Sequence, residues 1–476
     1  MRNFLKNNFL WLVIFMTPCF SAIAQETWTL QQCVDYAIKN NIQVKQNLLS
    51  VELAKTNLTQ SEANLLPNLN ANASNYYNYG KTIDQFTNSF ATEKVRSDRY
   101  SLQANVILFN GLQSYNSIKQ NQLNLEAGKY DAEKMVNDIS LYVASAYLQI
   151  LFAMEVVDIS NQQLLLTKAQ IERSKKLVDA GSIAKGTLLN IESQAASEEL
   201  QTVSAQNNLD IAYLNLTQLL ELRDTKNFKI SRPAVPELLN TELREDVETI
   251  YLNAVSNKPE IKSAELKLKS AQKGISIAKG ALSPQLSLGG SYGSGYSGLS
   301  KRIVGDAVYG IAPSGYFTAS NEPVLGPVLL NDFEKTPYSK QINDNLNKSF
   351  GFNLSVPLFN GFQVKSTIAK AKINTANAQL NLESAQKQLY KSIQQSWLDA
   401  QAALKKYAAS QKAVSALRES FHYSEQRYNL GMINPLEYTD AKNKLTKAES
   451  DLIQAKYDFV FKQNVLNFYQ GKPLSF

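Results

Sequence analysis

The residue types that carry most enzyme and metal chemistry are scarce in this chain of 476 residues, which holds one histidine and two cysteines. His422 has no second histidine or cysteine with which to form a metal site or a catalytic dyad. Cys33 is the one cysteine outside the first two dozen residues, and we expect it to be a small buried apolar residue. No nucleophile–histidine–acid set, phosphate loop or metal-ligand cluster stands out. The sequence therefore predicts no enzyme, no cofactor and no bound metal.

The first two dozen residues predict export from the cytoplasm. Arg2 and Lys6 precede an apolar stretch over residues 9–20, and Ala22-Ile23-Ala24 provides the small-x-small pattern that a signal peptidase requires. We therefore expect residues 1–24 to be a signal peptide and the mature chain to begin near Gln25. A lipoprotein anchored at Cys19 is the alternative, although the residue before it is a proline rather than a small residue.

The charges of the chain are dispersed. Its 49 basic and 42 acidic residues give a net charge of +7 without a basic patch, so a nucleic-acid partner is not expected. Beyond the leader no uninterrupted run of 18 apolar residues occurs, so we expect no ordinary transmembrane helix. If the mature protein enters a membrane, strands must carry it there.

The chain contains two copies of one unit. The segment Leu108-Phe109-Asn110-Gly111 recurs 250 positions later as Leu358-Phe359-Asn360-Gly361, and the same shift places Gly181 on Gly431. Upstream, Leu66-Pro67-Asn68-Leu69 resembles Ser283-Pro284-Gln285-Leu286 at a smaller shift, so the second copy has gained residues in its Gly/Pro-rich segment 298–347. Each copy is predicted to run short helix, helix, strand, loop, strand, very long helix, turn and long helix.

The long helices show a sevenfold spacing that pairs a larger residue with a small one, as in a coiled coil. In the first copy the larger positions are Val143, Ile150, Val157, Leu164, Ile171 and Val178; in the second they are Ile393, Ala400, Tyr407, Val414, Phe421 and Tyr428. A helix of this length extends on the order of 100 Å. Small residues between the larger ones allow close packing, in a curved wall as well as in a two-stranded rope.

Between the helices the period changes to two, which indicates strands. The two stronger strands alternate apolar with polar residues, from Tyr100 to Leu108 and from Phe350 to Leu358. About ten residues with one apolar and one polar face suit a tilted strand between lipid and water. Four such strands cannot close a barrel, so several chains must contribute. Two chains would give 8 strands and three would give 12, and the pattern permits either.

These patterns predict an α+β membrane protein with an internal two-fold repeat. We expect the first repeat at 25–221, with strands about 68–79 and 99–109 and long helices 111–180 and 187–221. Residues 222–259 are predicted to form a connection at mid-height of the helices. The second repeat is expected at 260–476, with strands about 285–297 and 348–358 and long helices 361–431 and 435–469. Both strand loops should lie on the face opposite the helices.

Several segments together resemble the TolC family of outer-membrane factors. They are the duplicated helix–hairpin–helix units, the Leu-Phe-Asn-Gly segments, the opening Trp28-Thr29-Leu30-Gln31-Gln32-Cys33-Val34, and the turn segments Leu177–Gly181 and Arg427–Gly431. The resemblance covers nearly all of the mature chain. It implies a homotrimer, a 12-stranded β-barrel in the outer membrane, a coiled-coil helical barrel in the periplasm, and docking of a periplasmic adaptor and an inner-membrane pump.

The resemblance also implies a pore constriction at the periplasmic tip. Glu437 and Asp440 stand where the family carries acidic residues, and three copies would form two carboxylate rings that attract cations. For Glu437 a second interpretation stays open, because Asn434-Pro435-Leu436-Glu437 is also a good helix start, with Asn434 as the N-cap.

Four further residues are expected at the tip turns. Gly181 and Gly431 can adopt positive φ and end helices, and in the family these turns also contact the adaptor. Tyr428 matches a tyrosine that helps close the tip in the family, but Ile433 replaces its basic partner and Thr187 replaces its acidic partner. The family's closing network is therefore not expected in the same form here.

The function predicted is a subunit of an outer-membrane exit duct for efflux or type I secretion. The alternative is a structural coiled-coil protein of the envelope without channel activity, which would leave the four alternating strands without a role. Cargo, the particular pump and the structure of segment 298–347 are not predicted.

Overall fold

The computed structural model describes residues 27–92, 94–223, 228–233 and 245–472. The chain divides into two compact units. Unit 1 consists of residues 1–48, 132–258 and 387–476, and unit 2 consists of residues 49–131 and 259–386. The predicted signal peptide 1–24 and Cys19 lie outside the described residues, as do parts of the predicted connection 222–259.

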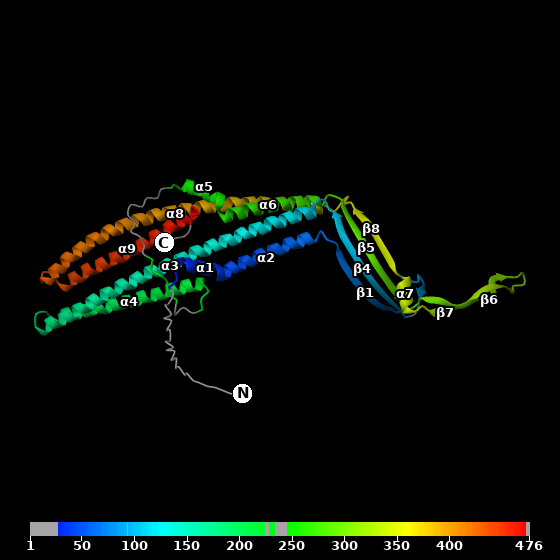
Figure 1. Ribbon diagram of the computed structural model, residues 1–476, viewed down its shortest axis with the longest axis horizontal. Coiled ribbons are helices and arrows are strands. Elements are labelled where there is room, and N and C mark those ends of the chain that lie inside the picture. The colour runs from blue at the N-terminus through cyan, green and yellow to red at the C-terminus, as the bar shows by residue number, and fades with distance from the viewer. Residues whose placement is uncertain (1–26, 93, 224–227, 234–244, 473–476) are drawn as a thin grey trace, which may run out of the picture. The chain divides into compact units, whose positions relative to one another are not determined.

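Unit 1 is built from helices (Figure 1). Those that lie wholly in it are α1 (Leu30–Asn40), α4 (Lys185–Leu219), α5 (Val247–Asn257) and α9 (Pro435–Tyr469). Parts of α2 (Ile42–Ala63), α3 (Gln113–Asp179) and α8 (Gln363–Asn429) complete it. The two longest helices, α3 and α8, have 67 residues each, and α4 and α9 have 35 each.

The sevenfold spacing of the long helices corresponds to buried positions. Val143 and Ile150 on α3 are fully buried, and Val157 and Leu164 are at most 9% exposed. On α8 the larger positions Ile393, Ala400, Tyr407 and Val414 are likewise buried. Towards the ends of both helices the spacing continues with half-buried residues. The packed stripe therefore accounts for most of the predicted seam.

The core of unit 1 forms where α1, α3 and α4 meet the described part of the segment after α4. Trp28 pairs with Ile230 in a parallel bridge and packs edge-on against Phe228. Tyr147 is fully buried and donates its hydroxyl to the carbonyl oxygen of Ser231 (2.7 Å). Residues distant in sequence thus clamp the middle of α3.

Within unit 1, two helix ends are contacted by the side chain of the residue that precedes another helix. The Asn41 side chain caps α2 through the backbone N–H of Gln43 (2.9 Å) and donates its amide to the carbonyl oxygen of Leu219 at the end of α4 (3.1 Å). Lys258, just before α6 (Pro259–Gly280), donates its ammonium to the carbonyl oxygen of Phe468 near the end of α9 (2.9 Å). Asn41 thus gives a partner to a carbonyl at the helix end, and the Phe468 carbonyl accepts from Lys258 in addition to the backbone N–H of Gly471 (3.1 Å).

Within the described residues, α3 is the one helix that is long and apolar enough in part to cross a bilayer. The expectation that no helix would qualify was therefore too strong. The apolar residues of α3 include Val143, Tyr147 and Ile150, which belong to the core of unit 1. This burial explains the hydrophobicity without a membrane, since the core helix of a folded domain passes the same test.

Unit 2 contains a four-stranded antiparallel sheet in the order β1-β4-β5-β8 (Figure 1). Its strands are β1 (Asn68–Asn78), β4 (Val95–Phe109), β5 (Gln285–Ser297) and β8 (Asn347–Ser355). Two predicted bounds were wrong: β4 begins at Val95 rather than near 99, and β8 ends at Ser355 rather than 358. A β-bulge between Ile107 and Phe109 also interrupts the predicted alternation at Leu108.

The register places most of the apolar residues of the four strands on one face. Ala71 lies opposite Leu102, Leu102 lies opposite Tyr292, and Leu288 lies opposite Phe352. The residues between them form the other face, which is mostly asparagine, serine, glutamine and glycine, with Tyr76, Arg99 and Ile107 among them. One sheet therefore presents an apolar surface and a polar surface.

The segments between the paired strands form structure that the sequence pattern did not predict. The loop after β1 contains β2 (Thr82–Ile83) and β3 (Phe90–Ala91). The segment after β5 forms a long hairpin of β6 (Lys301–Phe317) and β7 (Pro323–Lys335), followed by α7 (Tyr338–Asp344). Both lie at the end of the sheet opposite the helix connections, as expected from the topology (Figure 1).

Candidate functional site

The helices of unit 1 are joined in pairs by two glycine turns. Gly181 follows α3 and Gly431 follows α8, with φ of +67° and +72°. In each turn the following residue donates its backbone N–H five positions back, from Ser182 to Leu177 (2.8 Å) and from Met432 to Arg427 (2.8 Å). This is the hydrogen-bond pattern of a Schellman helix end. Both turns are exposed, and a Cβ at either glycine would meet open space, so the backbone angle alone favours glycine.

Glu437 lies in the first turn of α9 and takes part in its cap. Asn434 is the N-cap, its Oδ1 accepts the backbone N–H of Glu437 (2.9 Å), and its Nδ2 donates to Glu437 Oε1 (2.8 Å). Pro435 occupies the first helical position. The capping interpretation of Glu437 is therefore confirmed, and the carboxylate remains exposed next to the turn.

Asp440 lies one turn further along the same face of α9, because residues three apart on a helix are neighbours. Its Oδ2 accepts a hydrogen bond from Lys444 Nζ at 2.6 Å. Both side chains are about 60% exposed, so this ion pair is weak and screened by solvent. Lys444 is a positive charge beside the predicted constriction that the sequence reasoning missed.

Tyr428 stacks on Tyr438, with ring centroids 4.6 Å apart and an interplanar angle of 25°. Its hydroxyl accepts a hydrogen bond from Gln170 Nε2 (3.2 Å). One turn nearer the tip, Arg173 Nη1 donates to Asn429 Oδ1 (2.8 Å). These contacts join the end of α3 to the end of α8. The sequence analysis did not identify Gln170 or Arg173 as partners.

Thr187 occupies the position in α4 that Glu437 occupies in α9. It donates its backbone N–H to the carbonyl oxygen of Ala184, which is the N-cap and offers no side-chain acceptor. Tyr428 bonds to Gln170 rather than to Thr187. The two turns of the chain therefore differ in charge and in capping.

A buried polar cluster lies between α3, α4 and α9. Lys442 Nζ donates to Thr167 Oγ1 (2.5 Å) and to the carbonyl oxygen of Gln163 (3.1 Å), and it lies 3.4 Å from Glu198 Oε1. The same Glu198 oxygen accepts from Gln163 Nε2 (3.1 Å) and from Gln194 Nε2 (3.0 Å). The side chains of Lys442 and Glu198 are 8% and 1% exposed. In the described part of the chain, Glu198 Oε2 has no hydrogen-bond partner.

Burial changes the acid–base behaviour of this region. Desolvation lowers the pKa of the Lys442 ammonium, which its neighbour Glu198 opposes, and desolvation raises the pKa of Tyr438 to about 12. Lys442 is the one charged residue among the buried positions of α9, which otherwise hold Ala448, Ala455, Phe459, Val460 and Leu466. A charge in a packed stripe requires a partner.

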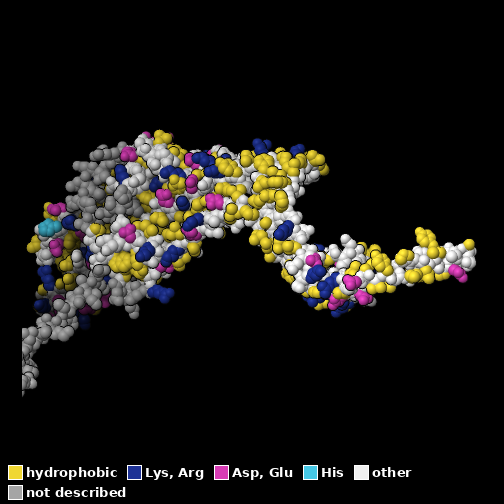
Figure 2. All heavy atoms as spheres, turned by 45° about the vertical axis from the view of Figure 1, so that its right-hand side comes forward, with side chains coloured by type: hydrophobic (Ala, Val, Ile, Leu, Met, Phe, Trp, Pro, Cys, Tyr) yellow, Lys and Arg dark blue, Asp and Glu magenta, His cyan; other side chains and the backbone are white. Residues whose placement is uncertain are grey.

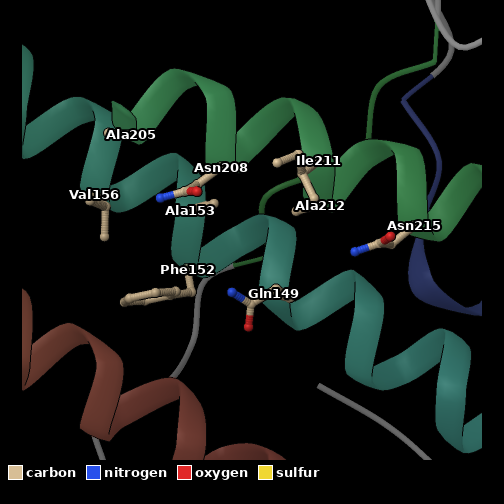
Figure 3. Close-up of a pocket in the computed structure, with 9 residues that line it drawn as sticks. All are labelled: Gln149, Phe152, Ala153, Val156, Ala205, Asn208, Ile211, Ala212 and Asn215. Carbon is tan, nitrogen blue, oxygen red and sulfur yellow. The ribbon is translucent and has the colours of Figure 1, made fainter. Parts of the chain in front are cut away.

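A pocket of about 470 Å³ with a mainly apolar lining lies between α3 and α4 (Figure 3). Its lining combines Phe152 and aliphatic side chains with three amides, those of Gln149, Asn208 and Asn215. The lining includes no ionisable side chain. This surface provides apolar contact area rather than acid–base groups.

Two structural features now define the class of this protein. It combines a sheet with one apolar and one polar face and very long paired helices with exposed turns, which is the construction of an outer-membrane channel. The model of the family described as "Outer membrane efflux protein" matches residues 33–221 and 250–472, and the chain belongs to this family.

Sequence relatives and solved structures agree with this assignment. The chain is 23% identical over 453 residues to the outer membrane protein TolC of Escherichia coli (strain K12), covering 93% of this chain and 82% of the relative. It is 22% identical to nodulation protein T of Rhizobium leguminosarum bv. trifolii, covering 93% and 85%. The crystal structure of the outer membrane protein VceC from Vibrio cholerae superposes with a TM-score of 0.72 at 15% identity, covering 94% and 97%. The chain is thus an outer-membrane channel protein for efflux or secretion, as the sequence predicted.

Proposed function

We propose that three copies of this chain close a 12-stranded barrel and a helical barrel, each copy contributing four strands and one pair of repeated helical hairpins. The assembly is an exit duct that carries cargo from a periplasmic adaptor and an inner-membrane pump across the outer membrane. Within it, residues 222–259 form the connection at mid-height of the helices.

The observation that carries this proposal is the four-stranded sheet with two different faces. In the described residues, β1 pairs only with β4 and β8 pairs only with β5, so both outer edges are free. Backbone groups on a free edge cannot remain in lipid, where each costs several kcal/mol. Repetition of the sheet around an axis pairs β8 of one copy with β1 of the next. The apolar face then contacts lipid and the asparagine- and serine-rich face lines a water-filled lumen.

Equal helix lengths support two structurally equivalent hairpins in each copy. The first hairpin, α3 and α4, has helices of 67 and 35 residues, and so does the second, α8 and α9. Three copies would supply six such hairpins. Six hairpins with small residues in their seams suit a closed tube.

Glu437 and Asp440 are proposed to form the pore constriction at the tip. Both carboxylates are exposed and stand one turn apart after the turn at Gly431. Three copies would place six carboxylates around the opening and favour cations. The cap at Asn434 holds Glu437 in position, so capping and a role in the pore are compatible.

The turns at Gly181 and Gly431 are proposed to contact the adaptor, together with the neighbouring Tyr428 and Thr187. Apolar side chains next to the second turn support a docking role: Leu430, Met432 and Leu436 are each at least 68% exposed. Exposed apolar groups of this size at the end of a helical hairpin are available for burial by a partner.

The first experiment is the mass of the purified particle in detergent together with its single-channel conductance. Three chains of 53.1 kDa, less their leaders, give a trimer of about 150 kDa that conducts ions. A soluble dimer without conductance would contradict the proposal and favour the structural coiled-coil alternative. The tip is tested separately: replacing both Glu437 and Asp440 with alanine should reduce cation selectivity in planar bilayers, and unchanged selectivity would rule out the constriction.

A further inference from the structure

The hairpin of β6 and β7 stands on a rigid base. Gln341 of α7 is 2% exposed; its Nε2 donates to the carbonyl oxygens of Ser297 (3.0 Å) and Thr336 (2.9 Å), and its Oε1 accepts the backbone N–H of Ser297 (2.8 Å). Ser297 Oγ also donates to Asp84 Oδ2 in the loop after β1 (2.7 Å). Thr336 and Ser300 close the neck of the hairpin through a backbone hydrogen bond of 2.9 Å. The hairpin is therefore anchored where it leaves the sheet.

One face of this hairpin, named the broad face, carries a row of apolar pairs that only Asn331 interrupts. Its members lie opposite one another in pairs: Ile303 with Phe333, Tyr309 with Leu329, Ile311 with Pro327, and Pro313 with Leu325. Tyr309 and Ile311 are 76% and 75% exposed. Charged residues instead gather at the base of the hairpin, as Figure 2 shows, where Arg302 and Glu334 form an ion pair of 3.2 Å.

The opposite face, named the flat face, has small residues at its centre. Gly310 lies opposite Val328, and Ala312 lies opposite Gly326. Val308 and Leu330 flank this centre. The two faces differ in shape, because the flat face has Gly310, Ala312 and Gly326 at its centre, with the side chain of Leu330 lying over Gly310, whereas the broad face carries bulky pairs there.

Two strands with both faces in water are at best marginally stable, so a cover for these faces is required. Lipid is disfavoured as the cover. A tilted strand needs about 9–11 residues to span the hydrocarbon layer, and β4 and β5 already have 15 and 13. The hairpin begins beyond the far end of these strands, and therefore beyond the layer that they span.

We propose that the cover is a second copy of this chain, and that three hairpins pack in a ring to form a collar above the outer mouth of the duct. This inference rests on the proposed trimer. A ring of three requires two different surfaces that fit each other, because each copy contacts its neighbours through opposite sides. The broad and flat faces supply such a pair. Barrel closure would also hold three hairpins at the same end, where tethering raises their effective concentration.

The collar is tested with spin labels on the full-length protein in detergent and in lipid vesicles. A label on Ser320→Cys, in the exposed turn between β6 and β7, reports the distance between hairpin ends of neighbouring copies. We expect distances well below the roughly 40 Å length of β7 itself, at about 3.3 Å for each of its residues. A label on Asn78→Cys, at the end of β1, is the control, because it reports the distance between neighbouring copies at the barrel.

The paired variant Ile311→Asp with Leu329→Asp places charges on the broad face and should abolish the short distances at Ser320→Cys. It should leave the distances at Asn78→Cys and the particle mass unchanged. A trimer in which the hairpin ends are far apart, or in which the charges change nothing, would overturn the collar and leave the proposed duct intact. A monomeric particle would overturn both.

A spin label on Ile311→Cys shows whether a second copy, lipid or water covers the broad face, through its collisions with oxygen and with a nickel complex. Protection from both a water-soluble nickel complex and oxygen is expected for packing between copies. Strong collision with oxygen would identify lipid as the cover, and strong collision with nickel would show an uncovered hairpin. Either of these results would overturn the proposal.

Discussion

Lys442 Nζ and Glu198 Oε1 lie 3.4 Å apart in a site where both side chains are more than nine-tenths buried. The pair joins α9 of the second hairpin to α4 of the first, and Thr167 adds a contact from α3. Removing one partner leaves a buried charge without compensation, which typically costs 3–5 kcal/mol.

We therefore expect Glu198→Gln to destabilise the helical part of the protein by about 3–5 kcal/mol. The measurement is the denaturant midpoint of the detergent-solubilised protein, followed by circular dichroism. Lys444→Gln is the matched control, because it breaks an exposed pair with Asp440 and should cost less than about 1 kcal/mol. Equal losses of stability in the two variants would show that the buried pair contributes no more than the exposed pair.

The buried tyrosines predict a loss of stability in alkali. Burial raises the pKa of Tyr438 to about 12, above its ordinary value near 10, so the unfolded chain loses this proton first. Stability should be fully present below pH 10 and should fall between about pH 10 and pH 12. Tyr438→Phe should reduce this fall, measured as the thermal midpoint at a series of pH values. A fall of the same size in the variant would assign it to other groups.

Titration of Lys442 changes stability with pH in the opposite direction, and at lower pH than Tyr438. Because its folded pKa is lowered by burial, the unfolded chain binds the proton more readily, and stability should rise as the pH approaches 10.5. Lys442→Met should remove this rise in the same pH series, while the later fall due to Tyr438 remains.

Gly111 provides a contrast with Gly361, its counterpart in the predicted repeat. Both have positive φ, but a Cβ at Gly111 would lie 2.3 Å from the carbonyl oxygen of Gly280, whereas a Cβ at Gly361 would meet open space. Gly111→Ala should therefore strongly reduce assembled protein in the outer membrane. Gly361→Ala should cost only the backbone strain of about 1–2 kcal/mol. Similar yields of the two variants would contradict the close approach.

The two faces of the sheet predict opposite tolerance to charge. Phe352→Asp introduces a carboxylate on the apolar face and should reduce the amount of protein extracted from outer membranes by detergent. Asn353→Asp, on the next residue and the polar face, should be tolerated. Insertion of both variants at equal levels would show that the apolar face does not contact lipid.

Replacing Lys444, which pairs with Asp440, is expected to change ion selectivity. It neutralises part of the charge at Asp440, so Lys444→Gln should increase cation preference in planar bilayers. The control is Lys447→Gln, which removes the same charge one turn further from the tip. If both variants shift selectivity equally, the effect comes from net charge and not from the constriction.

The periodic parts of the structure were accessible from the sequence. Burial of Val143 and Ile150 follows from the sevenfold spacing, and the common apolar face of Leu102 and Phe352 follows from alternation. Such patterns report burial directly, because helices and strands repeat their orientation at fixed intervals. The positions where strands begin and end were less accessible, since backbone pairing extends β4 to Val95 through residues without alternation.

The contacts of the tip could be predicted only in part. The Asn434–Glu437 cap is local and was identified, whereas the bonds from Gln170 to Tyr428 and from Lys442 to Thr167 join residues more than 250 positions apart. The hairpin in 298–347 was missed because its two apolar faces lack the alternation by which strands are identified.

Cys33 is fully buried beneath α3 in the core of unit 1, and this burial raises the pKa of its thiol to about 12. A thiol that stays protonated is a poor nucleophile and reacts slowly with oxidants. In the periplasm, which favours disulfides, folding itself then protects the chain from cross-linking through its one described thiol. The Cys33 thiol is accessible only before the core of unit 1 has formed. Slower folding should therefore increase the amount of disulfide-linked dimer.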